Sequence, residues 1–250
     1  MRIRGREVPL VVSLFMWLAV WEVVGQSELV FVVPAFSDVA RAVFDLFSLR
    51  SFGNDVLVTL RSFGIGMSIT LGVGLPIGFL MGRFHRVDEL LGMWVNLLMS
   101  APKTALVPVI MPLFGIGHKT VVFAVVLFSL WVVILDTRAG VRNVNESLLE
   151  MARSFGAKRS DMYSKVILWS ALPEILTGLR LAVIRGVRGA VIGQMMLSTL
   201  GLGKLFVTYS RSFLMARFFA VLVIVLLFAW SLSELVGRLE KRVEHFARCR

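Results

Sequence analysis

Long apolar stretches, separated by shorter polar ones, follow one another along nearly the whole chain. Six of them have few charges and reach or approach the roughly 20 residues that a helix needs to cross about 30 Å of hydrocarbon. They are Val8–Val24, Leu57–Met81, Leu90–Leu113, Val121–Leu135, Ile175–Leu200 and Phe218–Val236. Because backbone polar groups in lipid must be paired within the protein, we expect helices. The pattern predicts an all-α, polytopic membrane helix bundle with about six transmembrane helices, forming a single domain over residues 1–250.

Composition agrees with this reading. Apolar residues make up 57% of the 250 residues and the mean hydropathy is +0.82, well above an ordinary soluble domain. The first apolar run follows three arginines as in a signal peptide, but it carries Trp17, Trp21 and Glu22 and lacks a small-x-small cleavage site. We therefore expect a retained first helix.

The net charge of +11 follows membrane topology. The basic residues do not form one face interleaved with aromatics, so we expect no nucleic-acid partner. If the N-terminus is cytoplasmic, six crossings leave sixteen of the 27 Lys and Arg residues inside and eight outside, with three in the fifth span. The bias predicts that both termini face the cytoplasm. The lone Cys249 excludes an intramolecular disulfide, and the three scattered histidines do not suggest a metal site.

Two local patterns predict packing. After Pro34, apolar residues at Val39, Ala42, Val43, Leu46 and Phe47 favour a surface helix on the outer leaflet. In the second span, three glycines spaced four apart fall on one helical face, where they favour close helix packing over a gating role; they are Gly74, Gly78 and Gly82.

The third span contains two prolines and a lysine, in the run from Ala101 to Pro108. Broken backbone within the membrane is tolerated only against protein or a water-filled cavity. Lys103 therefore has two interpretations: it faces a translocation path, or it lies at the outer interface and extends its ammonium to water.

Residues 138–172 form a long, polar and basic segment that no simple connection requires. Asn143 or Asn145 can cap a helix from Glu146 to Phe155, Gly156 can end it in the left-handed conformation, and Ser160 can cap a second helix. We expect a helix, a sharp bend and another helix.

The run Glu150-Met-Ala152, with Gly156 four residues later and Val166-Ile-Leu168 beyond, resembles the EAA loop of permease subunits in bacterial ABC importers. Two positions depart from that pattern: Met151 replaces the second letter, and Trp169 stands where proline is usual. Trp169 removes the expected break, so the second helix can run on to Ala171.

The similarity extends through Ala171–Arg180 and through Ala101–Pro108 with Leu113–Gly117, which resemble the nitrate, sulfonate and taurine branch of these permeases. The resemblance implies a type I importer fold with a cytoplasmic coupling loop. It also implies a second permease subunit, two cytoplasmic ATPases that bind ATP and Mg, and an extracytoplasmic substrate-binding protein, all at the bacterial cytoplasmic (inner) membrane. Because a six-span subunit is too small to enclose a pore alone, we predict a pair of identical permease copies. The ATPase-coupling residues that it indicates are Glu150, Met151, Ala152, Arg153, Gly156 and Ala157. The alternative for this loop is an amphipathic segment on anionic lipid.

The chain contains no Gly-x-x-x-x-Gly-Lys-Ser/Thr run, so we expect it to hydrolyse no ATP itself. An ATP-independent secondary transporter or channel is the alternative, although we see no internal repeat of the kind typical of that class. A membrane-embedded enzyme is disfavoured, because no carboxylate pair or nucleophile-base set shares a membrane depth.

Three arginines lie in the fifth span, where the cost of burial favours a cavity or a paired charge. At 100° per residue, Arg180, Arg185 and Arg188 fall within an arc of about 140°, with Gln194 beside Arg180. We interpret Arg180 as structural and leave Arg185 open between a helix pairing and the path. The substrate path is predicted from Lys103, Arg185, Arg188 and Gln194, and it favours an oxyanion such as a sulfonate, nitrate or aromatic carboxylate.

Overall fold

The computed structural model describes residues 2–3, 6–7, 10–27 and 32–248, with side chains over 12–27 and 32–243. Arg4, Cys249 and Arg250 lie outside the described residues. Helices dominate, and the two short strands pair antiparallel with Arg2 opposite Glu7. The elements are β1 (Arg2–Ile3), β2 (Arg6–Glu7), α1 (Leu10–Gln26), α2 (Phe36–Ser48), α3 (Arg50–Arg83), α4 (His85–Ser100), α5 (Lys103–Phe114), α6 (His118–Arg142), α7 (Glu146–Ser154), α8 (Arg159–Asp161), the π-helix η1 (Met162–Ile167), α9 (Leu168–Leu197), α10 (Gly201–Arg211) and α11 (Met215–Arg248).

Four helices of the described chain are long and apolar enough to cross a membrane: α3, α6, the continuous run Arg159–Leu197 and α11. The third predicted span is a pair, α4 and α5, with a bend of 100° between them at Ala101-Pro102. The first is the shorter apolar helix α1. The all-α membrane bundle is confirmed. Among the described residues, four helices are long and apolar enough to cross a membrane, or five if the bent pair counts as one span, and α1 is a shorter apolar helix.

The bundle is built around α6, which packs against both α3 and α9, whereas α3 and α9 contact each other over a smaller area. The three spaced glycines of α3 make its packing on α6 possible. A Cβ at Gly78 would lie 2.6 Å from the Ile134 carbonyl oxygen, and one at Gly82 would lie 2.7 Å from Val141 Cβ. The predicted close packing is therefore confirmed.

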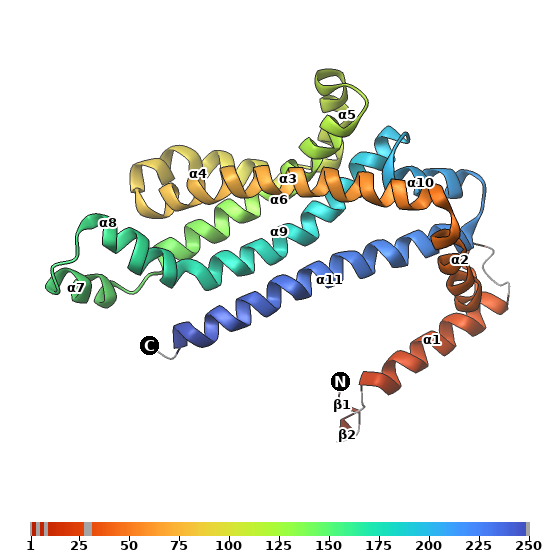
Figure 1. Ribbon diagram of the computed structural model, residues 1–250, viewed down its shortest axis with the longest axis horizontal. Coiled ribbons are helices and arrows are strands. Elements are labelled where there is room, and N and C mark those ends of the chain that lie inside the picture. Colours follow the sequence, from red (N-terminus) through yellow and green to blue (C-terminus); the bar gives the residue numbers. More distant parts are fainter. Residues whose placement is uncertain (1, 4–5, 8–9, 28–31, 249–250) are drawn as a thin grey trace.

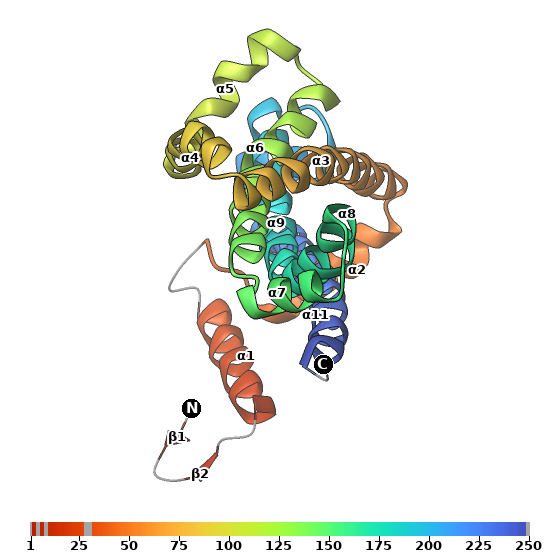
Figure 2. The same ribbon diagram turned by 90° about the vertical axis from the view of Figure 1, so that its left-hand side faces the viewer.

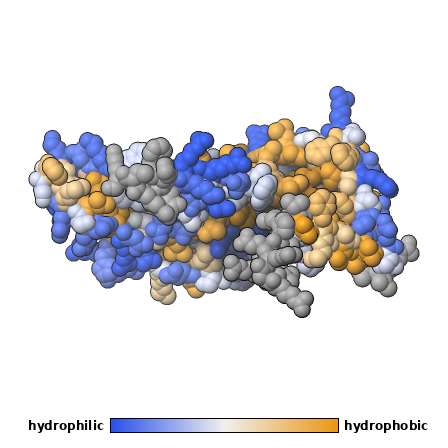
Figure 3. Space-filling model, turned by 90° about the horizontal axis from the view of Figure 1, so that it is seen from below, coloured by the Kyte–Doolittle hydropathy of each residue, from blue (hydrophilic) through white to orange (hydrophobic). Residues whose placement is uncertain are grey.

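The molecule is elongated, and its two ends differ (Figure 1). One end carries α7 and α8, and the opposite end carries α2 and α10. On the face shown in Figure 3, hydrophilic side chains gather toward the α7 end and hydrophobic ones toward the α2 end. Helix α5 projects away from the bundle and α1 stands to one side of it, as Figures 1 and 2 both show.

The predicted surface helix is α2, which begins at Phe36 and ends at Ser48. Val39, Ala42 and Leu46 are buried against the bundle, while Phe47 is 67% exposed. The second span begins earlier than expected, at Arg50, because a single extended residue, Leu49, separates the two helices.

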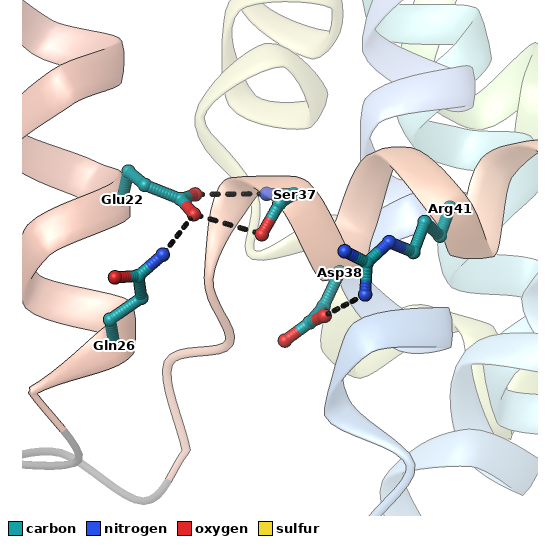
Figure 4. Close-up of polar contacts among 5 residues, drawn as sticks. All are labelled: Glu22, Gln26, Ser37, Asp38 and Arg41. Atoms are coloured by element: carbon teal, nitrogen blue, oxygen red, sulfur yellow. Dashed lines mark hydrogen bonds and ion pairs between the residues drawn. The ribbon is translucent and has the colours of Figure 1, made fainter.

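Helix α1 is held to the start of α2 by polar contacts (Figure 4). The Glu22 carboxylate accepts hydrogen bonds from the Ser37 backbone N–H at 2.9 Å and from the Ser37 hydroxyl at 2.8 Å, and Gln26 donates to it at 2.6 Å. The Trp21 indole donates to the Pro34 carbonyl at 3.0 Å. Glu22, whose charge argues against a signal peptide, thus joins α1 to α2.

Candidate functional site

Local chemistry defines both ends of α7. The Asn145 side chain caps its N-terminus by accepting from the Ser147 N–H at 3.0 Å. At the C-terminus, Gly156 has φ +75°, its N–H donates to Arg153, and the Ala157 N–H donates to Ala152. These two bonds form a Schellman motif, which satisfies helix-end carbonyls and turns the chain sharply. The predicted helix and glycine bend are confirmed, with the helix ending at Ser154.

All nine residues of α7 are at least partly exposed. Leu148, Met151 and Phe155 follow a spacing of three and four, so they share one side of the segment, and they are 38%, 53% and 84% exposed. Large apolar side chains on a charged helix outside the bundle are typical of a surface that a partner protein or a membrane covers.

The residues predicted to couple the chain to an ATPase lie together on this segment. Glu150, Met151, Arg153 and Gly156 are exposed, while Ala152 and Ala157 are half-buried. Among the described side chains, neither the Glu150 carboxylate nor the Arg153 guanidinium forms an ion pair.

The loop has a first limb before α7, at the end of α6, and a second limb after Gly156, formed by α8 and η1. The second limb differs from the prediction. Ser160 does not cap a helix; the N-cap residue is Lys158, and α8 passes through the π-helix η1 directly into α9. The helix does not stop at Ala171 but runs on through Pro173 to Leu197. Ile167, Ala171 and Ile175 are buried together with Val141 of α6, so tertiary packing outweighs the helix-breaking effect of proline.

Polar contacts anchor the base of the loop. Asp88 of α4 pairs with Arg138 and Arg142 at the end of α6. On the second limb, Arg83 Nε donates to the Tyr163 hydroxyl at 3.2 Å, and its guanidinium lies 5.4 Å from the centre of the Tyr163 ring. Both limbs are thereby fixed to the bundle, while α7 between them is exposed.

Three of the four predicted path residues line one cavity of about 240 Å³. Lys103 lies at the bend between α4 and α5, and Arg185 and Arg188 lie on α9; Ala101, Thr104 and Phe128 complete the lining. Arg185 also contacts Met99 Sδ at 3.4 Å. Among the described residues, none of these three cations forms an ion pair, so the cavity carries a net positive charge.

Gln194 does not line this cavity. It is fully buried, and its amide oxygen accepts from the Gly203 N–H at 3.0 Å and from the Thr59 hydroxyl at 3.1 Å. It therefore fixes the start of α10 to α9 and α3. Arg180 also lies outside the cavity, where it donates to the Ser233 hydroxyl at 3.2 Å and pairs with Glu240 at 3.8 Å on α11.

Sequence reasoning missed two sets of residues. The apolar stripe of α7 was readable from the spacing of Leu148, Met151 and Phe155 within a polar loop. The role of Asp88 could not be predicted from the sequence, because its partner Arg138 lies 50 residues away.

A membrane bundle with an exposed helical loop at one end and a basic cavity between its spans is the architecture of a transport protein. The model of the family described as binding-protein-dependent transport system inner membrane component matches residues 74–245. The chain belongs to this family. The predicted class, an ABC importer permease of type I fold, is confirmed, and so is its place as a multi-pass membrane protein. The family implies an ATPase and a substrate-binding protein as partners.

Known proteins agree with this assignment. A putative aliphatic sulfonates transport permease of Bacillus subtilis is 26% identical over 242 residues, which cover 96% of this chain and 86% of that protein. The nitrate import permease of Leptolyngbya laminosa is 23% identical over 246 residues, 95% and 88% of the two chains. A putative ABC transporter permease of Methanocaldococcus jannaschii is 31% identical over 127 residues, about half of each chain at 51% and 48%.

Among solved structures, a methionine ABC transporter in inward-facing conformations resembles this chain with a TM-score of 0.63. The match covers 82% of this chain and 95% of that one at 18% identity, so it concerns the fold alone.

Proposed function

We propose that the chain is one of two identical permease subunits of an ATP-driven importer, and that it carries a small organic or inorganic anion. The exposed apolar stripe on α7 is the observation that supports ATPase docking most directly. A bundle of this size is too small to enclose a pore alone, which favours a pair of copies.

The α7 end is proposed to face the cytoplasm together with both termini. Helix α1 runs toward the α2 end and α11 returns from there toward the α7 end (Figure 1). With α1 as a crossing, the chain passes the membrane six times and its termini share a side. The excess of basic residues assigned to the inside supports this orientation.

In this proposal the ATPase holds α7 in a groove and moves it. Glu150 is free to pair with a basic residue of the ATPase, Ala152 permits close approach, and Gly156 sets the angle at which the loop returns. Open space surrounds the Gly156 Cα, since an added Cβ would meet nothing within 4 Å. A larger residue there would strain the backbone without a steric clash.

Glu150→Ala and Gly156→Val test the coupling role in the permease–ATPase complex reconstituted in liposomes. We expect ATP hydrolysis to become independent of the loaded binding protein, while the melting temperature changes little. Glu146→Ala is the matched control, because Glu146 is another exposed carboxylate on the same helix. Normal coupling in both loop variants would refute the assignment.

The basic cavity supports an anionic substrate. Three cations that form no ion pair among the described residues repel one another, and an anion among them reduces that repulsion and forms charge-assisted hydrogen bonds. A cation would add to the repulsion, and a neutral sugar could accept hydrogen bonds but would leave the repulsion in place. The named sulfonate and nitrate permeases among the relatives are consistent with such a substrate, although selection also depends on the binding protein.

Arg188→Gln tests the substrate path, with uptake of ethanesulfonate and of nitrate measured separately. A charge-assisted hydrogen bond contributes about 1.5–3 kcal/mol, so we expect uptake to fall by about tenfold or more. Arg211→Gln, an exposed arginine on α10, is the control. Undiminished uptake of a transported anion by Arg188→Gln would remove Arg188 from the path.

A secondary transporter or channel is the competing function. It predicts uptake by liposomes that contain this chain without any ATPase, whereas the importer predicts none.

A further inference from the structure

Asp88 is a buried carboxylate that pairs with two less buried arginines where the loop leaves the bundle. It lies in the first turn of α4 and only 8% of its side chain is exposed. Arg138 binds it with both ends of the guanidinium group, Nε to Oδ1 at 2.6 Å and Nη2 to Oδ2 at 2.6 Å. Arg142 adds a contact from Nη1 to Oδ2 at 3.2 Å. Of the two Arg138 contacts, only that from Nη2 to Oδ2 is a hydrogen bond, because Oδ1 accepts none among the described residues. The ion pair nevertheless ties the start of α4 to the end of α6.

The next residue in the same turn has a different environment. Glu89 is a carboxylate whose one ion-pair partner among the described side chains is the exposed His85, and 65% of its own side chain is exposed. An exposed pair of this kind contributes little, whereas loss of one partner from a buried pair leaves an uncompensated charge. Neutralising Asp88 and neutralising Glu89 change the net charge equally, but only the first removes the ion-pair contact between α4 and α6. Comparing the two variants therefore separates the effect of that contact from the effect of charge.

The cations of the basic cavity are connected to the coupling loop by two routes, one through α4 to Lys103 at the start of α5 and one through α9. Arg138 and Arg142 belong to the last turns of α6, directly before the loop, and through Asp88 they hold the start of α4. Helix α4 has 16 residues and is therefore about 24 Å long. At its far end the chain bends and presents Lys103 to the cavity. The second limb continues without a break into α9, which presents Arg185 and Arg188.

We propose that Asp88 is a positioning residue that transmits loop movement to Lys103. The first limb moves Lys103 through the clamp and α4, and the second limb moves the two arginines through α9. The nucleotide state of the ATPase thus sets the spacing of the three cations, and with it the affinity of the cavity for an anion. The inference rests on the proposed function of the loop and the cavity.

The spacing can be measured without knowledge of the substrate. Val109 on α5 and Leu181 on α9 are 63% and 43% exposed, so Val109→Cys and Leu181→Cys can carry spin labels in one permease copy, with Cys249→Ser as background. Distances are recorded in the full permease–ATPase complex, without nucleotide and with a non-hydrolysable ATP analogue. We expect a nucleotide-dependent change in the parent and in Glu89→Gln, and none in Asp88→Asn.

Uptake and ATP hydrolysis are measured on the same complexes with the binding protein. Because coupling between sites typically amounts to about 5- to 150-fold, we expect Asp88→Asn to lower ethanesulfonate or nitrate uptake per ATP within that range. Arg138→Lys keeps the charge but loses the second of the two contacts, and we expect an intermediate loss. Asp88→Glu, which retains a carboxylate, should restore part of the coupling.

The outcomes separate this inference from the proposed function. Lack of ATP-driven uptake of either anion by the Glu89→Gln control would point to failure of the proposed function. Uptake by that control, with the same nucleotide-dependent distance change in Asp88→Asn, would overturn the clamp. If Asp88→Asn fails to assemble, Arg138→Lys decides, since normal uptake per ATP in that variant would also overturn it.

Discussion

The α3–α6–α9 core and the α7 segment lie in one chain but follow opposite rules. In the core, backbones approach so closely that glycines are required at the contacts, and the side chains between the helices are buried. On α7 each residue is at least partly exposed, and the fold is set by an asparagine cap and a glycine bend. The core determines whether the protein folds, and α7 is available to bind something else.

This separation has a physical basis. In lipid, helices associate through close packing and not through the hydrophobic effect, so small residues carry the stability of the bundle. In water, a short helix gains stability from its caps, and exposed apolar side chains give it affinity for a partner. Substitutions in the two regions should therefore produce different kinds of defect.

The largest effect is expected from Gly78→Leu. Its Cβ would lie 2.6 Å from the Ile134 carbonyl oxygen and 2.7 Å from Thr137 Cβ, and neither atom is the flexible end of a long side chain. Overpacking of this kind costs about 1–3 kcal/mol or more, and we expect poor accumulation in the membrane and a clearly lower melting temperature in detergent. Gly72→Leu in the same helix meets nothing within 4 Å and should behave as the parent does. Equal melting temperatures for the two variants would contradict the packing argument.

A smaller effect, and one of a different kind, is expected from Leu148→Asp combined with Phe155→Asp. Charges on the apolar stripe should remove contacts of hot-spot size, about 2 kcal/mol or more, and so weaken ATPase binding by about 30-fold. The melting temperature of the isolated permease should not change. Copurification of the ATPase with the tagged chain measures the effect, and Ser147→Asp, which adds a charge outside the stripe, is the control. A defect in folding instead of binding would show that the two regions are not independent.

A feature could be predicted from the sequence when the residues that determine it lie close together along the chain. The cap at Asn145 and the bend at Gly156 depend on residues within a few positions. The bend was predicted, and Asn145 was one of the two predicted caps. The end of the second loop helix was not, because Ala171 and Ile175 pack on α6 and carry the helix through Pro173. The apolar composition indicated a membrane helix bundle. It did not show that the third span bends at Pro102 or that α1 is short.

The candidate path shows the same limit. The spacing of Arg185 and Arg188 placed them on one side of α9, and the structure adds Lys103 from another helix to the same cavity. For Gln194 the helical angle was misleading, since a contact with Thr59, 135 residues away, determines its environment. Periodicity places a residue on a face, whereas only the packing of helices shows what that face meets.

The smallest effect is expected from neutralising the basic residues beside α7, with Lys158→Gln and Arg159→Gln together. Both are exposed, and if the loop lay on anionic lipid each would contribute about 1 kcal/mol near the surface. With α7 in an ATPase groove, the apolar stripe supplies the affinity, and ATP-driven uptake should change less than about twofold, as expected for exposed charges. Uptake is compared in liposomes with and without anionic lipid, with Lys241→Gln plus Arg242→Gln on α11 as the control pair. A loss specific to Lys158 and Arg159, and only where anionic lipid is present, would favour the lipid-bound loop and would remove the contrast between a packed core and a protein-docking segment.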